Sequence, residues 1–174
     1  MHTMFPTPTR LQRAILYLAA TRPGSWFLSR ILARFDRAWL RLTGGRRTLT
    51  TAMTGLPVVQ LTTRGVKSGR PRVCPLIMLP DGNRLIVFAS NFGSQRHPAW
   101  YLNLRANPNV NVEHNGASAP YRARPAGEAE RARYWRQAVA MYPGYRVYER
   151  RAGGRRIPII VLEPLREHSG MVLR

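Results

Sequence analysis

The sequence predicts an α+β protein in which an antiparallel β-barrel or sheet carries additional helices. Short apolar segments rich in β-branched residues follow one another from residue 57 onward, which is typical of strands. Two neighbouring pairs are joined by hairpin turn sequences, and no strand–crossover–strand pattern is present. The 174 residues, of which 44% are hydrophobic, are enough for one domain with its own core.

Two helices are expected before the first strand. Residues 9–20 form a short apolar segment that Pro23 and Gly24 end, and residues 25–42 follow, with Ser25 as N-cap. The second helix places apolar residues on one face and arginines on another. Such a helix either lies on an anionic membrane or packs its apolar face on the domain, and the sequence leaves both open.

Turn and breaker residues divide the rest of the chain. Pro80-Asp81-Gly82-Asn83 and Asn115-Gly116 predict hairpins, and Asn107-Pro108 ends a helix. The expected strands are 57–62, 72–79, 84–89, 109–114, 119–125 and 156–162. The expected helices are 97–106 and 127–141. We therefore divide the chain into a basic N-terminal segment (1–50), a main domain (51–166) and a C-terminal tail (167–174).

The charge is strongly positive. Lysine and arginine number 28 against 8 acidic residues, a net charge of +20, and Lys67 is the one lysine. The arginine excess fits a codon bias, but the charge also predicts attraction to nucleic acid, an anionic membrane or a polyanionic small molecule. With so few acids we expect no glycosidase pair or metal site, and Cys74 alone excludes an internal disulfide. No apolar run is long enough for a membrane span and no secretory pattern is present, so we expect a cytoplasmic protein.

The loop around the lysine is the first candidate site. Residues 62–72 read Thr-Thr-Arg-Gly-Val-Lys-Ser-Gly-Arg-Pro-Arg and lie between two expected strands. Backbone N–H groups of a glycine-containing turn, with Lys67, Ser68 and Arg72 beside them, can hold an anion such as a phosphate. The spacing of a P-loop is absent. An exposed basic hairpin is the alternative.

The second candidate site follows the strand 84–89. Ala89-Ser90-Asn91-Phe92-Gly93 is a small polar turn, and the expected helix 97–106 comes after it. Such a turn lets the backbone approach a flat heteroaromatic ligand, and Ser90 or Asn91 can hydrogen-bond its edge. Trp100 and Tyr101 are more often core residues than cofactor contacts, and His97 in isolation is structural.

The third candidate site is a group of tyrosines. Tyr142, Tyr145 and Tyr148 share one side if the segment is helical, and each carries a hydroxyl on an apolar ring. A packed aromatic corner is the alternative. Because the chain offers no evident nucleophile, base or metal site, an enzyme of this kind depends on a cofactor for its chemistry.

These three clusters together resemble the deazaflavin-dependent nitroreductase family, whose members bind coenzyme F-420. The resemblance covers residues 61–164 and includes Thr-Thr-x-Gly-x-Lys-Ser-Gly-x-Pro-Arg, Ala-Ser-Asn-Phe-Gly, His-Pro-Ala-Trp-Tyr-Leu-Asn-Leu, Met-Tyr-Pro-x-Tyr and Ile-Pro-Ile-Ile-Val-Leu-Glu-Pro. It implies a split β-barrel of the FMN-binding type. It also implies an oxidoreductase that transfers a hydride from C5 of the reduced deazaflavin to a quinone, nitroaromatic or activated-enone acceptor.

The resemblance also implies a role for each cluster. Lys67, Ser68 and Arg72, with Val66 beside them, would hold the phosphate and the glutamyl tail. The cofactor's linker would run along Val73, Cys74, Pro75, Leu76 and Ile77. The ring would be bordered by Phe88, Ala89, Ser90 and Asn91 and supported by Ala99, Trp100, Tyr101, Leu102 and Asn103. Tyr142, Tyr145 and Tyr148 would form the acceptor side, where a tyrosine hydroxyl or Ser90 would orient the acceptor.

Three positions depart from the family pattern. Val66 stands where some relatives carry a second cation, and Asn91 where some carry Lys, so fewer tail contacts are expected. Ile77 replaces an aromatic residue of some nitroimidazole-reducing members. A quinone acceptor would give the basic helix 25–42 a purpose, which is docking at the membrane where quinones reside.

Three other functions stay open at this point. An FMN-dependent reductase on the same barrel explains the pocket residues, and a non-catalytic deazaflavin or quinone carrier would need the same pocket. A nucleic-acid-binding module explains the charge, but the arginines are dispersed and no recognition motif is present. Split barrels often pair, which makes a homodimer possible, but the sequence leaves the oligomeric state open.

Overall fold

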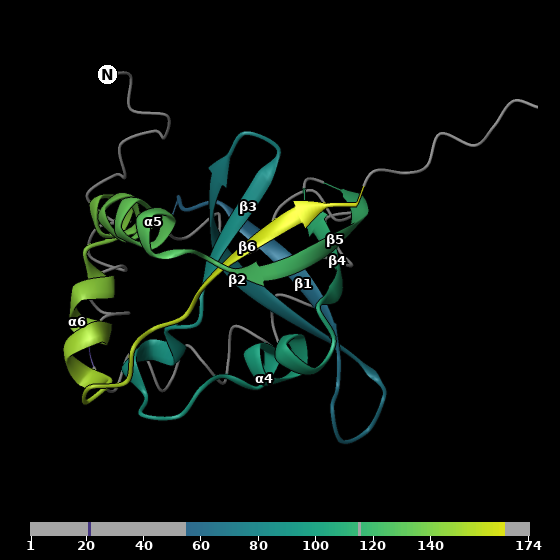
Figure 1. The fold of residues 1–174 in the computed structure, drawn as a ribbon, viewed down its shortest axis with the longest axis horizontal. Coiled ribbons are helices and arrows are strands. Elements are labelled where there is room, and N and C mark those ends of the chain that lie inside the picture. The colour runs from purple at the N-terminus through teal and green to yellow at the C-terminus, as the bar shows by residue number, and fades with distance from the viewer. Residues whose placement is uncertain (1–20, 22–54, 115, 166–174) are drawn as a thin grey trace, which may run out of the picture.

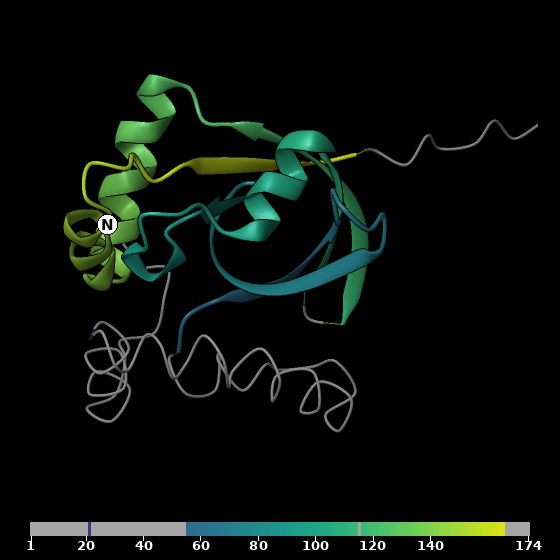
Figure 2. The same cartoon turned by 90° about the horizontal axis from the view of Figure 1, so that it is seen from below.

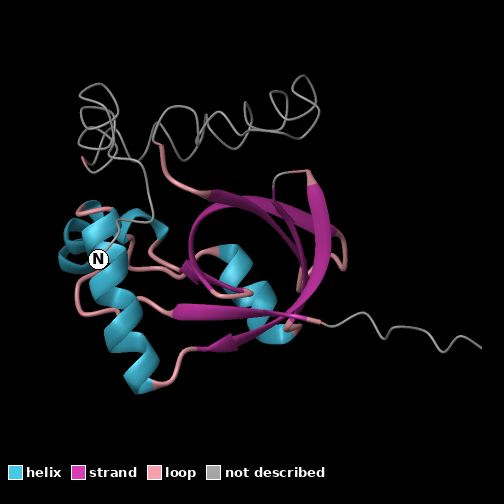
Figure 3. Ribbon diagram, turned by 90° about the horizontal axis from the view of Figure 1, so that it is seen from above, coloured by secondary structure: helices cyan, strands magenta, loops and turns pink. Residues whose placement is uncertain are grey.

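The computed structural model describes Thr21 and residues 55–114 and 116–165, and these form a six-stranded barrel with helices around it. The strands are β1 (Val58–Arg64), β2 (Pro71–Asp81), β3 (Arg84–Phe88), β4 (Asn109–His114), β5 (Ala117–Pro125) and β6 (Ile159–Pro164). They close into a barrel (Figure 3). The order around it is β1-β2-β3-β6-β5-β4, and every neighbouring pair is antiparallel. The prediction of an antiparallel barrel with added helices is therefore confirmed.

In the described residues, four helical elements surround the barrel. The 3-10 turn η1 (Asn91–Gly93) and the helix α4 (Ala99–Ala106) follow β3, whereas α5 (Glu128–Met141) and α6 (Gly144–Arg151) lie between β5 and β6. Figures 1 and 2 show α4 across one end of the barrel and α5 and α6 together at its side. None of these helices is long and apolar enough to cross a membrane.

Alternate side chains from all six strands fill the interior of the barrel. This alternation follows from the two-residue period of a strand, in which neighbouring side chains point to opposite faces. Trp100 and Leu104 of α4 close the end of this inner core. Its buried members are Val59, Leu61, Met78, Val87, Ala89, Trp100, Leu104, Val110, Val112, Ala123, Ile160 and Leu162.

A second core lies outside the barrel, between its wall and the helices α5 and α6. Leu79, Ile86, Phe88, Ile159 and Val161 point outward from β2, β3 and β6 and meet the helices. The helical side of this core is largely aromatic. It consists of Tyr134, Ala138, Val139, Tyr142, Tyr145 and Tyr148.

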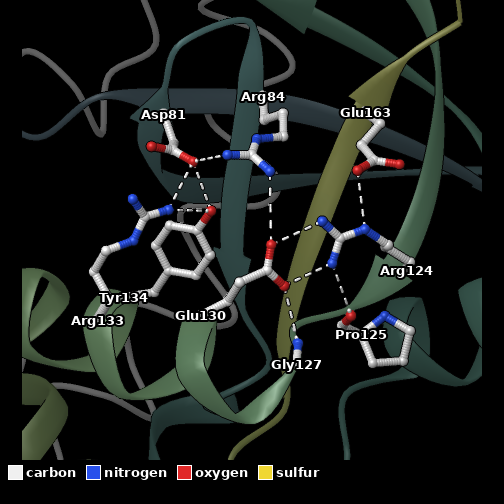
Figure 4. Close-up of polar contacts among 9 residues, drawn as sticks. All are labelled: Asp81, Arg84, Arg124, Pro125, Gly127, Glu130, Arg133, Tyr134 and Glu163. Atoms are coloured by element: carbon white, nitrogen blue, oxygen red, sulfur yellow. Dashed lines mark hydrogen bonds and ion pairs between the residues drawn. The ribbon is translucent and has the colours of Figure 1, made fainter.

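A polar network connects α5 to the turn of the β2–β3 hairpin (Figure 4). Asp81 accepts hydrogen bonds from Arg84 at 2.6 Å and from the Tyr134 hydroxyl at 2.6 Å. Glu130 binds both arms of the Arg124 guanidinium at 2.7 and 2.9 Å, and Arg124 also reaches Glu163 at 2.9 Å. The network therefore links α5 with four strands.

The predicted elements agree with the observed ones within a few residues, and one helix is added. Both predicted hairpins form, with Gly82 and Gly116 in the left-handed conformation at φ +64° and +79°. The segment 144–151, for which no helix was assigned from the sequence, is the helix α6. The predicted helices 9–20 and 25–42 and the tail 167–174 lie outside the described residues, apart from Thr21 just beyond the first helix.

Candidate functional site

The first two candidate sites meet at one end of the barrel. The loop 65–70, which joins β1 to β2, and the helix α4 lie at this end (Figure 1). The turn 89–93 leads from the end of β3 towards α4. Segments that are up to 40 residues apart in the sequence are thereby brought to one rim.

The loop 65–70 is closed by its own backbone. The Gly65 N–H donates to the Arg70 carbonyl at 2.9 Å, and the Gly69 N–H donates to the Gly65 carbonyl at 2.8 Å. Gly69 has φ +64°, and a Cβ on Gly65 would lie 2.9 Å from Ser68 Oγ. The positive φ favours glycine at position 69, whereas a side chain at position 65 would require Ser68 to turn away.

Asn103 fastens this loop to α4. Its side-chain oxygen accepts the Val66 N–H at 3.2 Å, and its Nδ2 donates to Thr63 Oγ1 at 3.1 Å. Thr63 in turn donates to the Arg72 carbonyl at 3.4 Å. Asn103 is buried and both ends of its amide are used, so its contacts position the loop.

The loop presents four cations to solvent. Arg64, Lys67, Arg70 and Arg72 are exposed, and within the described part of the chain none of them forms an ion pair. A cluster of unpaired cations beside backbone N–H groups attracts an anion.

The strand β2 is incompletely covered next to this loop. Four successive residues, Cys74 to Ile77, are half-buried although their side chains alternate between the two faces. Burial raises the pKa of the Cys74 thiol to about 11, and its Sγ donates to the Pro75 carbonyl at 3.7 Å. Cys74 is therefore a protonated thiol near neutral pH and no nucleophile.

The turn after β3 has an unusual backbone. Asn91 and Phe92 have φ values of +49° and +54°, and Gly93 follows at +79°. Two successive non-glycine residues in the left-handed region cost roughly 1–2 kcal/mol each, so other contacts must hold the turn. The Asn91 side chain supplies one by donating to the Arg96 carbonyl at 2.9 Å.

Arg155 holds the turn 89–94 through its carbonyl groups, and this role was not predicted from the sequence. Its guanidinium donates to the carbonyls of Ala89 (3.1 Å), Ser90 (2.8 Å) and Ser94 (2.9 Å), and it contacts His97 Nδ1 at 3.3 Å. Burial, and then the neighbouring Arg155 and Arg105, lower the pKa of His97, so the ring is neutral and Nδ1 accepts from Arg155. No local sequence pattern points to this arginine, because its acceptors lie about 60 residues earlier.

The three tyrosines gather under the same turn. Tyr142 and Tyr148 share a hydrogen bond between their hydroxyls at 2.9 Å, and the ring of Tyr145 packs against Phe88 with a centroid distance of 5.0 Å. The ring of Phe92 meets Tyr148 at 5.9 Å. All three tyrosines are at least 96% buried, and this burial raises the pKa of Tyr142 and Tyr145 well above that of a free phenol.

Glycines allow the turn and the tyrosines to come so close. A Cβ on Gly93 would lie 2.8 Å from the Tyr148 carbonyl oxygen, and a Cβ on Gly144 would overlap the ring of Tyr142. The second and third candidate sites are therefore in direct contact.

The predicted site residues divide into three groups by exposure. The exposed ones are Val66, Lys67, Ser68, Arg72, Val73, Ala99 and Leu102. The half-buried ones are Cys74, Pro75, Leu76, Ile77, Ser90, Asn91 and Tyr101. The buried ones are Phe88, Ala89, Trp100, Asn103, Tyr142, Tyr145 and Tyr148. The first two groups are open to a ligand along the rim.

These residues fit an anionic, flat heteroaromatic cofactor. The unpaired cations of the loop suit a phosphate and carboxylates, and the uncovered stretch of β2 leads from them into the barrel wall. Residues 89–91 add small side chains and backbone polar groups at the far end of the rim. Among residues 55–114 and 116–165, no three His, Cys, Asp or Glu side chains gather in a way that could hold a metal ion.

Two mycobacterial proteins are similar to this chain in sequence. A candidate F420H(2)-dependent quinone reductase of Mycobacterium tuberculosis, Rv3178, is 37% identical over 109 residues, which are 63% of this chain and 91% of that protein. The F420H(2)-dependent quinone reductase Rv1261c of the same species is 33% identical over 109 residues, which are 61% and 72% of the two chains.

Solved structures and a family model agree with these relatives. An F420-H2 dependent reductase (FDR-A) matches with a TM-score of 0.57 and 37% identity over 62% of this chain and 94% of that chain. A second chain, described as a domain-swapped dimer, matches with a TM-score of 0.59 and 32% identity over 81% and 99% of the two chains. The family resemblance and the split-barrel fold expected from the sequence are confirmed. Because the family model for F420H(2)-dependent quinone reductase matches residues 32–164, this chain belongs to that family of oxidoreductases.

Proposed function

We propose that this chain transfers a hydride from reduced coenzyme F-420 to a quinone, with the cofactor bound along the rim formed by loop 65–70, β2 and the turn 89–91. This position of the cofactor is supported by one observation. Asn103 holds the cationic loop 65–70 at the same end of the barrel as the turn 89–91. Family membership supports the cofactor and the reaction class, and favours coenzyme F-420 over FMN.

The exposed end of the rim suits the acidic part of the cofactor. Lys67 and Arg72 would neutralise the phosphate and the glutamyl carboxylates, and Ser68 would donate a hydrogen bond from its hydroxyl. The residues from Val73 to Ile77 would lie along the linker, where their half-buried side chains would become covered. At this end of the rim, the role of the chain would be to bind and orient the cofactor.

The other end of the rim suits the ring. Residues 89–91 would border it, and the first turn of α4 would support it, with Ala99 and Tyr101 accessible and Trp100 packed beneath. When bound, the reduced deazaflavin supplies a hydride from its C5. The contribution of the chain is to place an acceptor next to that carbon and to exclude water.

The tyrosines would shape the acceptor side as neutral groups. Because burial raises the pKa of Tyr142 and Tyr145, these phenols stay protonated. All three rings are at least 96% buried, so they would hold the turn and the Phe92 ring in place for the acceptor instead of donating to a quinone directly, with the Tyr148 hydroxyl 2.9 Å from that of Tyr142.

Turnover of reduced coenzyme F-420 with menadione, a nitroimidazole and an activated enone tests the reaction, and menadione is expected to react fastest. Lys67→Ala should raise the cofactor Kd about tenfold through loss of a charge-assisted contact, whereas Arg136→Ala, which removes an exposed charge from α5, should not. Tyr148→Phe should lower kcat more than it changes the Kd. Tight binding of FMN without binding of coenzyme F-420 would overturn the proposal.

Three further properties belong to this proposal. The similarity to a domain-swapped dimer supports a homodimer, which light scattering of the purified chain tests. Peripheral contact of the predicted helix 25–42 with the inner face of the cell membrane would keep a cytoplasmic enzyme near membrane quinones. Replacing Arg30, Arg34, Arg37 and Arg41 by Gln should then abolish binding to anionic liposomes. Unchanged liposome binding would exclude it.

A further inference from the structure

The turn next to the proposed ring position has backbone donors without an acceptor. Within residues 55–114 and 116–165, the amide N–H groups of Ser90 and Asn91 donate no hydrogen bond, whereas those of Gly93 and Ser94 donate to the Ser90 and Asn91 carbonyls. The Ser90 hydroxyl also has no partner in this part of the chain. Both residues are half-buried, so the turn is partly open to a bound ligand.

Arg155 binds the opposite ends of the same peptide groups. The Ala89 carbonyl shares a peptide group with the Ser90 N–H, and the Ser90 carbonyl shares one with the Asn91 N–H. Arg155 donates to these carbonyls at 3.1 and 2.8 Å. Since hydrogen bonds in a chain polarise one another, a cation at the carbonyl oxygen strengthens the N–H of that peptide group as a donor.

The charge of Arg155 is not neutralised by a carboxylate. In the described part of the chain its guanidinium binds three carbonyl oxygens and the His97 ring and forms no ion pair. The other ionisable side chains that lie against the turn include His97, Arg151 and Tyr148, with Arg105 close to His97, and none of them carries a carboxylate. A half-buried, uncompensated cation below two open N–H donors favours a negatively charged ligand.

On the basis of the proposed deazaflavin site, we propose that Arg155 is a positioning residue that makes the Ser90 and Asn91 amides a donor pair for the anionic form of the 8-hydroxy-deazaflavin ring. The 8-hydroxyl is a phenol-type acid, and its negative charge spreads over the conjugated ring. Arg155 holds the strained turn in the shape that presents the amides, and its charge selects the ionised ring over the neutral one.

Binding of two ring fragments tests the charge selection without any turnover. The first is the 8-hydroxy-5-deazaflavin ring with its ribityl chain, lacking phosphate and glutamates, and the second is its 8-O-methyl ether, which cannot ionise. Both dissociation constants are measured by fluorescence for the full chain and for Arg155→Gln. The matched control is Arg156→Gln, because Arg156 also carries one charge but is 61% exposed and binds Glu128.

Arg155→Gln should weaken binding of the hydroxylated fragment about tenfold and that of the ether by less than about threefold, while Arg156→Gln changes neither. Equal losses for both fragments would reduce Arg155 to a structural role and overturn the inference, as would losses equal to those of Arg156→Gln. If Arg155→Gln melts at a much lower temperature, the Arg155→Lys variant is used to separate the effect of the charge from that of lost stability. It retains the charge and should retain the preference for the hydroxylated fragment even where both constants rise, and loss of that preference would overturn the inference.

The two proposals fail in different ways. A folded wild-type chain that binds neither coenzyme F-420 nor its ring fragment would overturn the proposed function. A wild-type chain that binds both, together with an Arg155→Gln variant indistinguishable from Arg156→Gln, would overturn only the role of Arg155.

Discussion

Replacing Glu130 by Gln removes the charge at the centre of the network that joins α5 to the barrel (Figure 4). One carboxylate oxygen accepts from the Gly127 N–H at 2.9 Å and from Arg124 Nη1 at 2.7 Å, and the other accepts from Arg124 Nη2 at 2.9 Å. A glutamine amide cannot accept both arms of the guanidinium, because its nitrogen is a donor. The variant therefore loses the paired contact and weakens the start of the helix.

The expected loss follows from these contacts. The glutamine oxygen can still accept the Gly127 N–H, so at the helix start only the negative charge is lost, which is worth about 0.3–1 kcal/mol. A bidentate but partly exposed ion pair adds about 0.5–1 kcal/mol, since a quarter of the Glu130 side chain faces solvent, which screens the pair. Glu130→Gln should lower the free energy of unfolding by about 1–2 kcal/mol at pH 7, which lowers the Tm by roughly 2–8 °C for a chain of this size.

The loss should vanish in acid. The hydrogen bonds from Arg124, and then the Gly127 N–H, lower the pKa of Glu130 to about 2 in the folded protein. Because the folded pKa lies below the unfolded one, the carboxylate stabilises the fold above about pH 5. That contribution is lost as the pH falls through the unfolded pKa towards 2, so the two proteins should approach equal stability.

Urea unfolding of both proteins at pH 7, 5, 4 and 3 measures this difference. Glu128→Gln is the matched control, because Glu128 lies in the same first turn but is 78% exposed in its pair with Arg156, and no measurable change is expected. A difference that stays constant from pH 7 to pH 3, or an equal loss in the control, would refute the reasoning.

Three further substitutions or reactions test other parts of the structure. Gly144→Ala should cost about 1–3 kcal/mol and change the near-UV tyrosine signal, because its Cβ overlaps the Tyr142 ring, whereas Gly127→Ala should be tolerated. Asn103→Leu should raise the cofactor Kd and cost about 1–3 kcal/mol by leaving the Val66 N–H and Thr63 hydroxyl without their partner, and Asn103→Asp should do less harm. Cys74, with its pKa raised to about 11, should react with iodoacetamide at pH 7.5 far more slowly than free cysteine, and fast labelling would contradict its burial.

Turn chemistry explains why the barrel could be predicted from the sequence. Pro80-Asp81-Gly82-Asn83 requires a left-handed residue between two apolar segments, and Gly82 adopts that conformation at φ +64°. The Asn115-Gly116 pair carries the same local signal. Closure of the barrel through the pairing of β1 with β4 has no local signal, because it joins residues about 50 positions apart. The resemblance to a family supplied it.

The helix α6 and the role of Arg155 depend on contacts distant in sequence. Pro143-Gly144 is typical of a loop, yet the helix begins at Gly144, where the Tyr142 ring leaves no room for a side chain. Arg155 acts on carbonyl oxygens of residues 89–94, and carbonyls are identical at every position of a sequence. Side-chain motifs could therefore reveal the loop 62–72 and the turn 89–93, but not the arginine that holds the turn.

The two ends of strand β2 differ in whether their charged side chains form ion pairs. At its Asp81 end, carboxylates pair with arginines from β3, β5 and α5. Its Pro71 end lies ten residues away, which is about 33 Å measured along the strand. There, in the described part of the chain, the four cations of the loop form no ion pairs. The unpaired end is also the end that Asn103 fixes in place, so the fold supplies a preorganised cation cluster where the acidic tail of the cofactor is proposed to bind.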